Sequence, residues 1–328
     1  MITVVIPTIG RRSLHRLLDA LEPDLPVIVV DDRPRFCPAL KVPEHVRVLR
    51  TGGRGPATAR NAGWRAAATP WIAFLDDDVV PPPGWKDALL ADLRDLGEDV
   101  AGSQGRLEVR LPADRRPTDA ERNTAALTEA GWATADMAYR RSALEGVGGF
   151  DERFPRAYRE DADLALRLLK AGHRLVKGRR VTWHPVRDDG FWTSVRAQRG
   201  NADDALMRRL HGAGWRAAVG GVPGRFARHA MTTFMGVASI ALLLAAGARR
   251  EAGRRPGRLV QSRVRNTTAL GAAAAGLAWL GLTAEFAWAR LAPGPRTPEE
   301  IVRMAVTSVV IPPVACAHRL RGELRARR

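Results

Sequence analysis

The 328-residue chain contains few cysteines and few lysines. Its two cysteines, Cys37 and Cys316, are too few for a disulfide framework or a cysteine zinc cluster within one chain, so we expect a reducing compartment. Only four of its 52 basic residues are lysine. Residues 1–7 are apolar but lack the basic segment that opens a secretory signal, so we expect a cytoplasmic protein. A composition of 45% hydrophobic and 27% charged residues excludes disordered and collagen-like classes.

The net charge of +17 is concentrated in the last third of the chain. Residues 1–207 carry 32 basic and 30 acidic residues, whereas residues 208–328 carry 20 basic and 5 acidic residues. This shift predicts two domains, 1–207 and 208–328, of which the second is basic, alanine-rich and helical. A nucleic-acid binder built on that basic region is an alternative. It would need exposed aromatic residues among its arginines, but the arginines flank alanine-rich runs, so we expect no nucleic-acid partner.

Short β-branched runs alternate with helical patterns through the first hundred residues. The predicted strands are residues 2–6, 27–30, 46–49 and 71–75, and the predicted helices between them are 13–21 and 56–68. Another strand near 135–139 and a helix over 160–170 follow. This alternation predicts an α/β fold, with a mostly parallel sheet flanked by helices on both faces.

Polar residues follow three of these strands. They are Pro7 and Thr8 after the first, Asp31 and Asp32 after the second, and Asp76, Asp77 and Asp78 after residues 71–75. The carboxyl ends of parallel strands meet at one edge of the sheet, where ligands of such folds bind. Carboxylates crowded together repel one another unless a cation or hydrogen-bond donors offset their charge.

The aspartate triplet is the first candidate metal site. Asp76 and Asp78 point to the same side of an extended strand end, so they can share one divalent cation while Asp77 points elsewhere. Mg²⁺ or Mn²⁺ bound by two carboxylates and a diphosphate suits these hard oxygen ligands. The alternative is a solvated acidic turn that caps the next helix. His184 is a further candidate ligand, although a lone histidine is more often structural.

Glu160 and Asp161 open the predicted helix over 160–170. Acidic residues in a first turn stabilise the helix dipole, which is the ordinary explanation for them. A carboxylate fixed at a helix start in a cleft can also act as a general base. Trp85, Trp132 and Trp183 are candidates for stacking on a ligand ring, but core packing is the commoner role of tryptophan.

Seven motifs in one order over residues 1–205 resemble the inverting family 2 glycosyltransferases of GT-A fold. They are VVIPT (4–8), VVDD (29–32), ARNAG (59–63), FLDDD (74–78), MAYRR (137–141), GGFD (148–151) and EDADL (160–164). The resemblance implies transfer of a sugar from a nucleotide-diphosphate donor with inversion at the anomeric carbon. The QxxRW pattern of processive synthases is absent, so a single addition is expected.

The resemblance also implies roles for individual residues. Pro7, Thr8, Asp31 and Asp32 would bind the nucleotide, Arg60 would approach the donor, and Asp77 would line the sugar pocket. Asp76 and Asp78 would bind Mn²⁺ or Mg²⁺ on the diphosphate, and Asp161 would take the proton from the acceptor hydroxyl. The segment after Asp32 reads Arg-Pro instead of the common Gly-Ser, which leaves the neighbouring nucleotide contacts open.

A sugar-nucleotide nucleotidyltransferase is the competing enzyme class, because it shares a related α/β architecture. Such enzymes begin with a glycine-rich loop and a downstream lysine for the triphosphate. Residues 6–13, IPTIGRRS, do not form that loop.

The acceptor is unknown from the sequence: a glycan, a lipid-linked molecule or a small molecule all remain open. Two uncharged runs of 19 residues, 230–248 and 266–284, approach the length of a bilayer span, and a shorter run, 304–317, is interrupted by Pro312 and Pro313. Residues 249–265 contain seven arginines and one glutamate. Export of such a loop opposes the positive-inside tendency. We therefore expect peripheral contact with an anionic membrane at the inner face of the cell membrane, and a role in cell-envelope or lipid-linked glycan synthesis.

Overall fold

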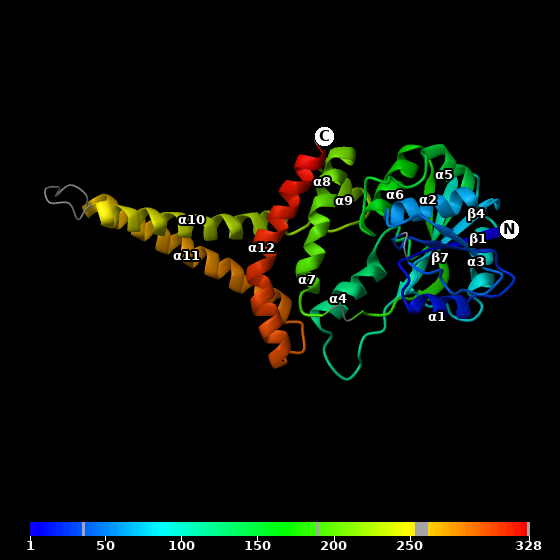
Figure 1. Cartoon of the computed structure of the whole chain (residues 1–328), viewed down its shortest axis with the longest axis horizontal. Coiled ribbons are helices and arrows are strands. Elements are labelled where there is room, and N and C mark those ends of the chain that lie inside the picture. Colours follow the sequence, from blue (N-terminus) through cyan, green and yellow to red (C-terminus); the bar gives the residue numbers. More distant parts are fainter. Residues whose placement is uncertain (35–36, 188–189, 253–261, 327–328) are drawn as a thin grey trace. The chain divides into compact units, whose positions relative to one another are not determined.

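A computed structural model describes residues 1–34, 37–187, 190–252 and 262–326. It divides the chain into two compact units (Figure 1). Unit 1 comprises Met1–Leu111, Glu121–Arg187 and Met207–Val222, and unit 2 comprises Pro112–Ala120, Asp188–Leu206 and Pro223–Arg328. The boundary expected at residue 207 falls within helix α8 (Gly200–His211), and the two units interleave along the chain.

Unit 1 contains a seven-stranded sheet with the order β3-β2-β1-β4-β6-β5-β7. Its strands are β1 (Ile2–Thr8), β2 (Val27–Asp31), β3 (Arg47–Arg50), β4 (Trp71–Leu75), β5 (Val100–Glu108), β6 (Asp136–Arg140) and β7 (Arg174–Trp183). All neighbouring strands run parallel except β6, which is antiparallel to β4 and β5. The predicted α/β class with a mostly parallel sheet is confirmed.

Helices cover both faces of this sheet. Helices α1 (Ser13–Ala20) and α3 (Trp85–Leu93) pack on one face, and α2 (Pro56–Ala66), α5 (Arg141–Val147) and α6 (Glu160–Lys170) pack on the other (Figure 1). Alternate residues of β1 divide between the two cores, with Val4 and Ile6 in one and Val5 in the other. Because β1 is buried on both faces, it contains an almost continuous apolar run.

Short helices connect the larger elements. They are α4 (Asp119–Ala125), η1 (Ala126–Glu129), α7 (Thr193–Arg196), η2 (Ala197–Arg199) and α9 (Trp215–Ala218).

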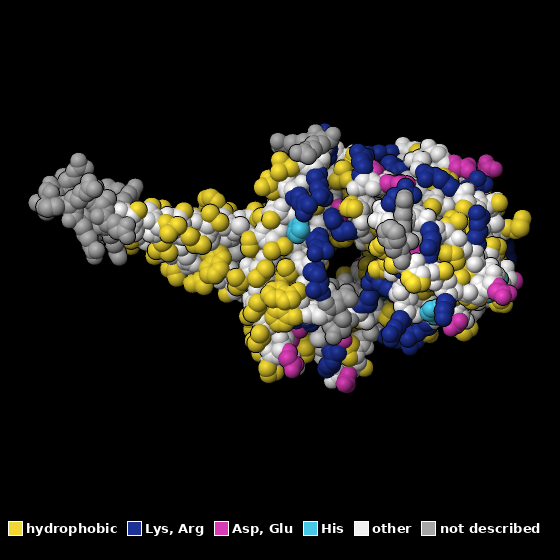
Figure 2. All heavy atoms as spheres, in the orientation of Figure 1, with side chains coloured by type: hydrophobic (Ala, Val, Ile, Leu, Met, Phe, Trp, Pro, Cys, Tyr) yellow, Lys and Arg dark blue, Asp and Glu magenta, His cyan; other side chains and the backbone are white. Residues whose placement is uncertain are grey.

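Unit 2 contains three long helices, α10 (Phe226–Ala252), α11 (Ser262–Leu291) and α12 (Pro298–Ala326). By length and composition each is long and apolar enough to cross a membrane, over Phe226–Ala248, Thr267–Leu291 and Pro298–Ala326. Many of their large apolar side chains are exposed, as the yellow surface over α10 and α11 in Figure 2 shows. The interruption expected at Pro312 and Pro313 was wrong, because α12 continues through both prolines.

Candidate active site

A cleft of about 360 Å³ lies at the carboxyl edge of the sheet in unit 1. Eleven residues line it: Pro7, Thr8, Ile9, Arg11, Asp32, Pro56, Asp76, Asp77, Arg156, Ala157 and Arg187. Five of them are residues that the sequence singled out, and they come from three different strand ends. The parallel topology therefore brings these strand ends to one cleft, as expected for this kind of sheet.

Asp76 is held by a buried arginine of helix α2. Nη2 of Arg60 donates to Oδ1 of Asp76 at 2.8 Å, and Nη1 of the same guanidinium donates to Oε1 of Glu160 at 2.5 Å. Arg60 is 1% exposed and is not among the residues that line the cleft. Its neighbouring carboxylates raise its pKa above the ordinary value in spite of its burial. Arg60 thus ties the end of β4 to the start of α6.

Asp77 and Asp78 each pair with a different arginine. Asp77 accepts the hydroxyl of Thr8 at 2.6 Å and Nη1 of Arg11 at 2.7 Å. Asp78 forms an ion pair with the guanidinium of Arg187, which follows β7. Each carboxylate of the triplet therefore faces a different guanidinium, and the one on Asp76, Arg60, is shared with Glu160.

Asp78 has the features of a cation ligand. Its side chain is 3% exposed, and neither carboxylate oxygen accepts a hydrogen bond from the described residues. Burial, reinforced by the charge of Asp76, raises the pKa of Asp78. Nε2 of His184, the expected further ligand, lies 3.8 Å from Oδ1 of Asp78. Within the described ranges, however, no group of three or more histidine, cysteine, aspartate or glutamate side chains is already arranged to bind a metal ion.

Asp161 stands at the second position of α6. Its Oδ1 accepts the backbone N–H of Ala162 at 2.7 Å, and burial raises the pKa of its carboxyl above the ordinary value. The residue before the helix, Arg159, has a left-handed backbone with φ +79°, a conformation that costs free energy outside glycine. Burial likewise raises the pKa of Glu160 to about 7, against the opposing charge of Arg60.

Asp32 accepts hydrogen bonds from the loop that precedes α2. Its carboxylate accepts the hydroxyl of Thr51 at 2.6 Å and the backbone N–H groups of Gly53, Arg54 and Gly55 at 2.8–3.0 Å. A carboxylate that accepts four donors fixes the local backbone strongly. Asp32 therefore shapes one wall of the cleft by holding this loop.

Asp31, in contrast, lies outside the cleft lining. Both of its oxygens accept the guanidinium of Arg33, at 2.8 and 2.9 Å, and this pairing lowers the pKa of Asp31.

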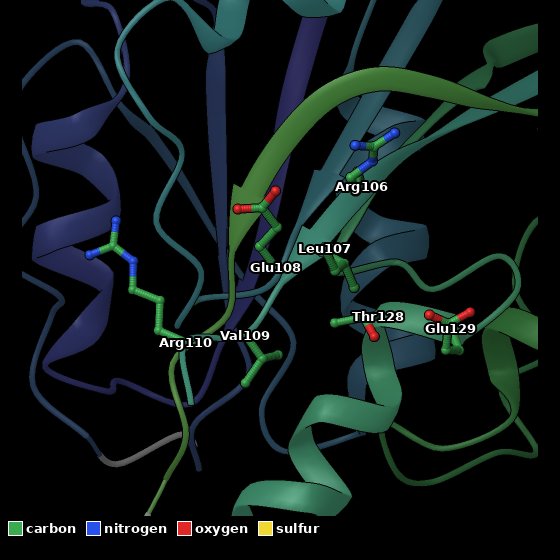
Figure 3. A pocket seen from close by; sticks show the side chains of 7 residues that line it. All are labelled: Arg106, Leu107, Glu108, Val109, Arg110, Thr128 and Glu129. Atoms are coloured by element: carbon green, nitrogen blue, oxygen red, sulfur yellow. The ribbon is translucent and has the colours of Figure 1, made fainter. Parts of the chain in front are cut away.

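A second cavity, of about 420 Å³, opens where β5 ends (Figure 3). Its lining comprises Arg106, Leu107, Glu108, Val109 and Arg110 from β5 and the residues after it, and Thr128 and Glu129 from η1. The N–H of His184 donates to the carbonyl of Glu108 at 2.8 Å. This cavity is therefore next to the strand end that carries His184.

The three candidate tryptophans differ in their surroundings. Trp85 is 1% exposed and donates its indole N–H to Asp136 at 2.9 Å, so it belongs to the core. Trp132 and Trp183 are partly buried, and the guanidinium of Arg110 lies 3.8 Å from the ring centre of Trp183.

Sequence reasoning missed the three arginines that line the cleft, Arg11, Arg156 and Arg187. Arg11 follows the end of β1 by three residues, so its place after Thr8 was a usable signal. Arg187 gave no comparable signal, because its pairing with Asp78 depends on β7, a strand that the sequence pattern did not predict.

The chain is similar to known proteins in sequence and in fold. The sequence profile of the family described as "Glycosyl transferase family 2" matches residues 3–154. A pre-mycofactocin glycosyltransferase from two strains of Mycobacterium tuberculosis is 36% identical over 195 residues, which covers 53% of this chain and 40% of that protein. The chain thus matches less than half the length of these curated relatives.

Among solved structures, a mannosyltransferase from Pyrobaculum calidifontis in complex with GDP-Man and Mn²⁺ is similar in fold. The TM-score is 0.52 at 19% identity, and the match covers 97% of this chain and 86% of that chain. At this identity the likeness concerns the fold alone, and it agrees with the GT-A architecture expected from the motifs. Residues 3–154, with the strand ends that form the cleft, belong to the family 2 glycosyltransferases.

Proposed function

We propose that the protein transfers a sugar from a nucleotide-diphosphate donor to an acceptor hydroxyl, by a single metal-assisted displacement that inverts the anomeric carbon. The observation that carries this proposal is the cleft in which strand ends of the sheet bring together Thr8, Asp32, Asp76 and Asp77, with Asp78 directly beside them. The match of residues 3–154 to the family 2 glycosyltransferases supports the same reaction class.

Different residues serve the donor in different ways. Pro7 and Thr8, which line the cleft, would contact the nucleotide, and Asp77 lines the cleft beside Thr8. Asp32 supports the nucleotide site indirectly, by fixing the loop before α2. The oxygens of Asp31 are already paired with Arg33, so Asp31 supports the site by fixing that arginine. Arg60 is buried, so it serves the donor by fixing Asp76.

The residues at the aspartate triplet fit a divalent cation, Mn²⁺ or Mg²⁺. Asp78 offers two buried oxygens that accept no hydrogen bond, one of them ion-paired with Arg187. Asp76 has one oxygen engaged by Arg60, and His184 lies near Asp78. Two carboxylates that leave coordination positions for phosphate oxygens are a usual arrangement for these ions. Such a cation offsets the charge that grows on the departing diphosphate.

Asp161 is the proposed base. The start of α6 fixes its position, and its raised pKa makes its carboxylate a better proton acceptor than an ordinary aspartate. The base removes the proton of the acceptor hydroxyl as that oxygen attacks the anomeric carbon from the face opposite the diphosphate. One displacement inverts the centre, so no covalent glycosyl intermediate on a carboxylate is needed.

The two predicted domains divide the work in this proposal. Residues 1–207 supply the transferase domain, and residues 208–328 bring it to an anionic membrane at the inner face of the cell membrane. The exposed apolar side chains of α10, α11 and α12 support such contact, and the arginine excess of this region favours anionic headgroups. An acceptor in cell-envelope or lipid-linked glycan synthesis is consistent with this location.

The test is turnover with a panel of nucleotide sugars in the presence of Mn²⁺, measured as the release of nucleoside diphosphate. For a donor that reacts, the anomeric configuration of the product is read by NMR. We expect inversion, and we expect Asp161→Asn to lose about 10²–10⁴-fold in turnover while it still binds the nucleoside diphosphate. Glu145→Gln, at an exposed carboxylate of α5, is the control. Retention of configuration, or unchanged turnover of Asp161→Asn, contradicts the proposal.

A further inference from the structure

Two aspartates of the triplet, Asp76 and Asp78, are paired with arginines of very different exposure. Arg60, on Asp76, has a side chain that is 2% exposed and is also tied to Glu160. Arg187, on Asp78, has a side chain that is 39% exposed and lines the cleft. Arg187 also lies beyond the end of β7, in a segment without helix or strand. The side chain of Arg187 can therefore change its partner within the cleft with little rearrangement, whereas that of Arg60 cannot.

Asp78 cannot keep its arginine and bind a divalent cation equally well. The guanidinium of Arg187 lies against Oδ2 of Asp78, which is one of the two oxygens that the cation would use. Two positive groups on one buried carboxylate repel each other. Without a cation, the ion pair with Arg187 offsets the cost of burying the charge of Asp78.

We infer that Arg187 is an exchangeable counter-charge: it pairs with Asp78 when no cation is bound, and it moves to the diphosphate of the donor when a divalent cation takes Asp78. This inference rests on the proposed function, and it assigns to Arg187 a donor-binding role that neither the motifs nor the comparisons give. Arginine suits this exchange, because its guanidinium binds carboxylate and phosphate with the same geometry. The diphosphate of a donor bound in the cleft would be within reach of Arg187, since Arg187 lines the same cleft as Thr8 and Asp76.

The exchange predicts two effects of opposite sign for Arg187→Gln. The variant lacks the competitor for Asp78, so it binds Mn²⁺ alone about three- to tenfold more tightly than the wild type. It also lacks a phosphate ligand, so at saturating Mn²⁺ it binds GDP or UDP about tenfold more weakly. Arg187→Lys retains the charge but not the paired geometry, and we expect its affinities for Mn²⁺ and nucleotide to lie between those of the wild type and Arg187→Gln.

The chain offers a matched control in Arg11. This arginine also lines the cleft, pairs with the neighbouring Asp77, and is 37% exposed, so Arg11→Gln removes the same charge from the same cleft. Loss of one positive charge raises Mn²⁺ affinity slightly at a distance, and Arg11→Gln measures that general effect. The gain for Arg187→Gln has to exceed it.

The experiment is calorimetric titration of the full-length protein with Mn²⁺ alone, and then with GDP or UDP at saturating Mn²⁺. Melting temperatures of all variants verify folding. The inference is overturned if Arg187→Gln binds Mn²⁺ no more tightly than Arg11→Gln, or if its affinity for both nucleotides equals that of the wild type. The proposed function survives that result, because wild-type protein would still bind Mn²⁺ and nucleotide. If wild-type protein binds neither, the proposed function and this inference both fail.

Discussion

Arg60 and Glu160 form a buried ion pair in which Nη1 lies 2.5 Å from Oε1, and each side chain is 2% exposed. The pair joins two elements that are 100 residues apart in sequence, α2 and the first turn of α6. Because the same guanidinium also holds Asp76, the positions of the proposed metal ligand and the proposed base depend on one arginine. The proposed catalytic arrangement is therefore part of the packing of unit 1.

Replacement of Arg60 is expected to destabilise the fold. Arg60→Met leaves the carboxylate of Glu160 buried without its partner, which lowers the free energy of unfolding by about 3–5 kcal/mol. Arg65→Met on the same helix is the control, because Arg65 is 53% exposed and its nearest carboxylate oxygen, on Glu152, is 3.7 Å away. That pair contributes at most about 1 kcal/mol. Chemical denaturation measures both, and equal losses in the two variants would refute the role given to Arg60.

The rate of transfer should fall on acidification at a higher pH than an ordinary aspartate would require. Burial raises the pKa of Asp161 above 3.8, and only the deprotonated form can accept a proton. The profile of kcat/KM against pH is therefore expected to decline, as pH is lowered, with a midpoint above 3.8. The residual activity of Asp161→Asn should lack this decline. A wild-type profile that stays level down to pH 4, in protein shown to be folded, would argue against Asp161 as the base.

Gly55 connects the Asp32 loop to another wall of the cleft. It has φ +100°, and a Cβ atom there would lie 3.0 Å from the carbonyl oxygen of Pro155, just before the cleft residues Arg156 and Ala157. Gly55→Ala is expected to cost about 1–3 kcal/mol and to weaken binding of nucleoside diphosphate, because these loops must separate.

Gly84→Ala is the matched control for that variant. Gly84 has φ +78°, but a Cβ atom there would meet nothing within 4 Å. Gly84→Ala should lower the free energy of unfolding by about 1 kcal/mol, from backbone strain alone. Nucleotide titrations and thermal melts separate the two effects, and equal losses of nucleotide affinity in both variants would contradict the steric explanation.

Membrane contact is expected to depend on charge. The full-length protein should sediment with vesicles that contain phosphatidylglycerol more than with vesicles of phosphatidylcholine alone, because each arginine near anionic headgroups contributes on the order of 1 kcal/mol. Added salt should release much of the bound protein from these vesicles, because screening weakens the attraction between arginines and anionic headgroups. Equal binding to both kinds of vesicle would show that arginine charge is not the cause. Sedimentation with neither would reject the membrane proposal.

Local sequence patterns were enough to predict much of the fold. The helix over 160–170 has the predicted bounds, and the strands at 71–75 and near the amino terminus were recognised from their β-branched and apolar runs. The sheet edge that gathers Thr8 and the aspartate triplet followed from the rule for parallel strands. Such features depend on residues close together in the chain.

The missed features depend on contacts distant in sequence. The use of Asp32 by the backbone of Gly53, Arg54 and Gly55 needs a particular turn, and the pairing of Arg187 with Asp78 needs the bridge between β7 and residue 80. Many of the 52 basic residues could have paired with any one carboxylate. The tertiary fold alone selects the partner.

The most direct test of the account is the dependence of nucleotide binding on a metal ion and on Asp78. Calorimetric titration of GDP and UDP is performed with and without Mn²⁺, on the wild-type protein and on Asp78→Asn. We expect at least one nucleotide to bind the wild type tightly only when Mn²⁺ is present, and Asp78→Asn, still folded, to lose about 10- to 100-fold of this affinity. Equal nucleotide affinity with and without Mn²⁺, or unchanged affinity in Asp78→Asn, would contradict the account.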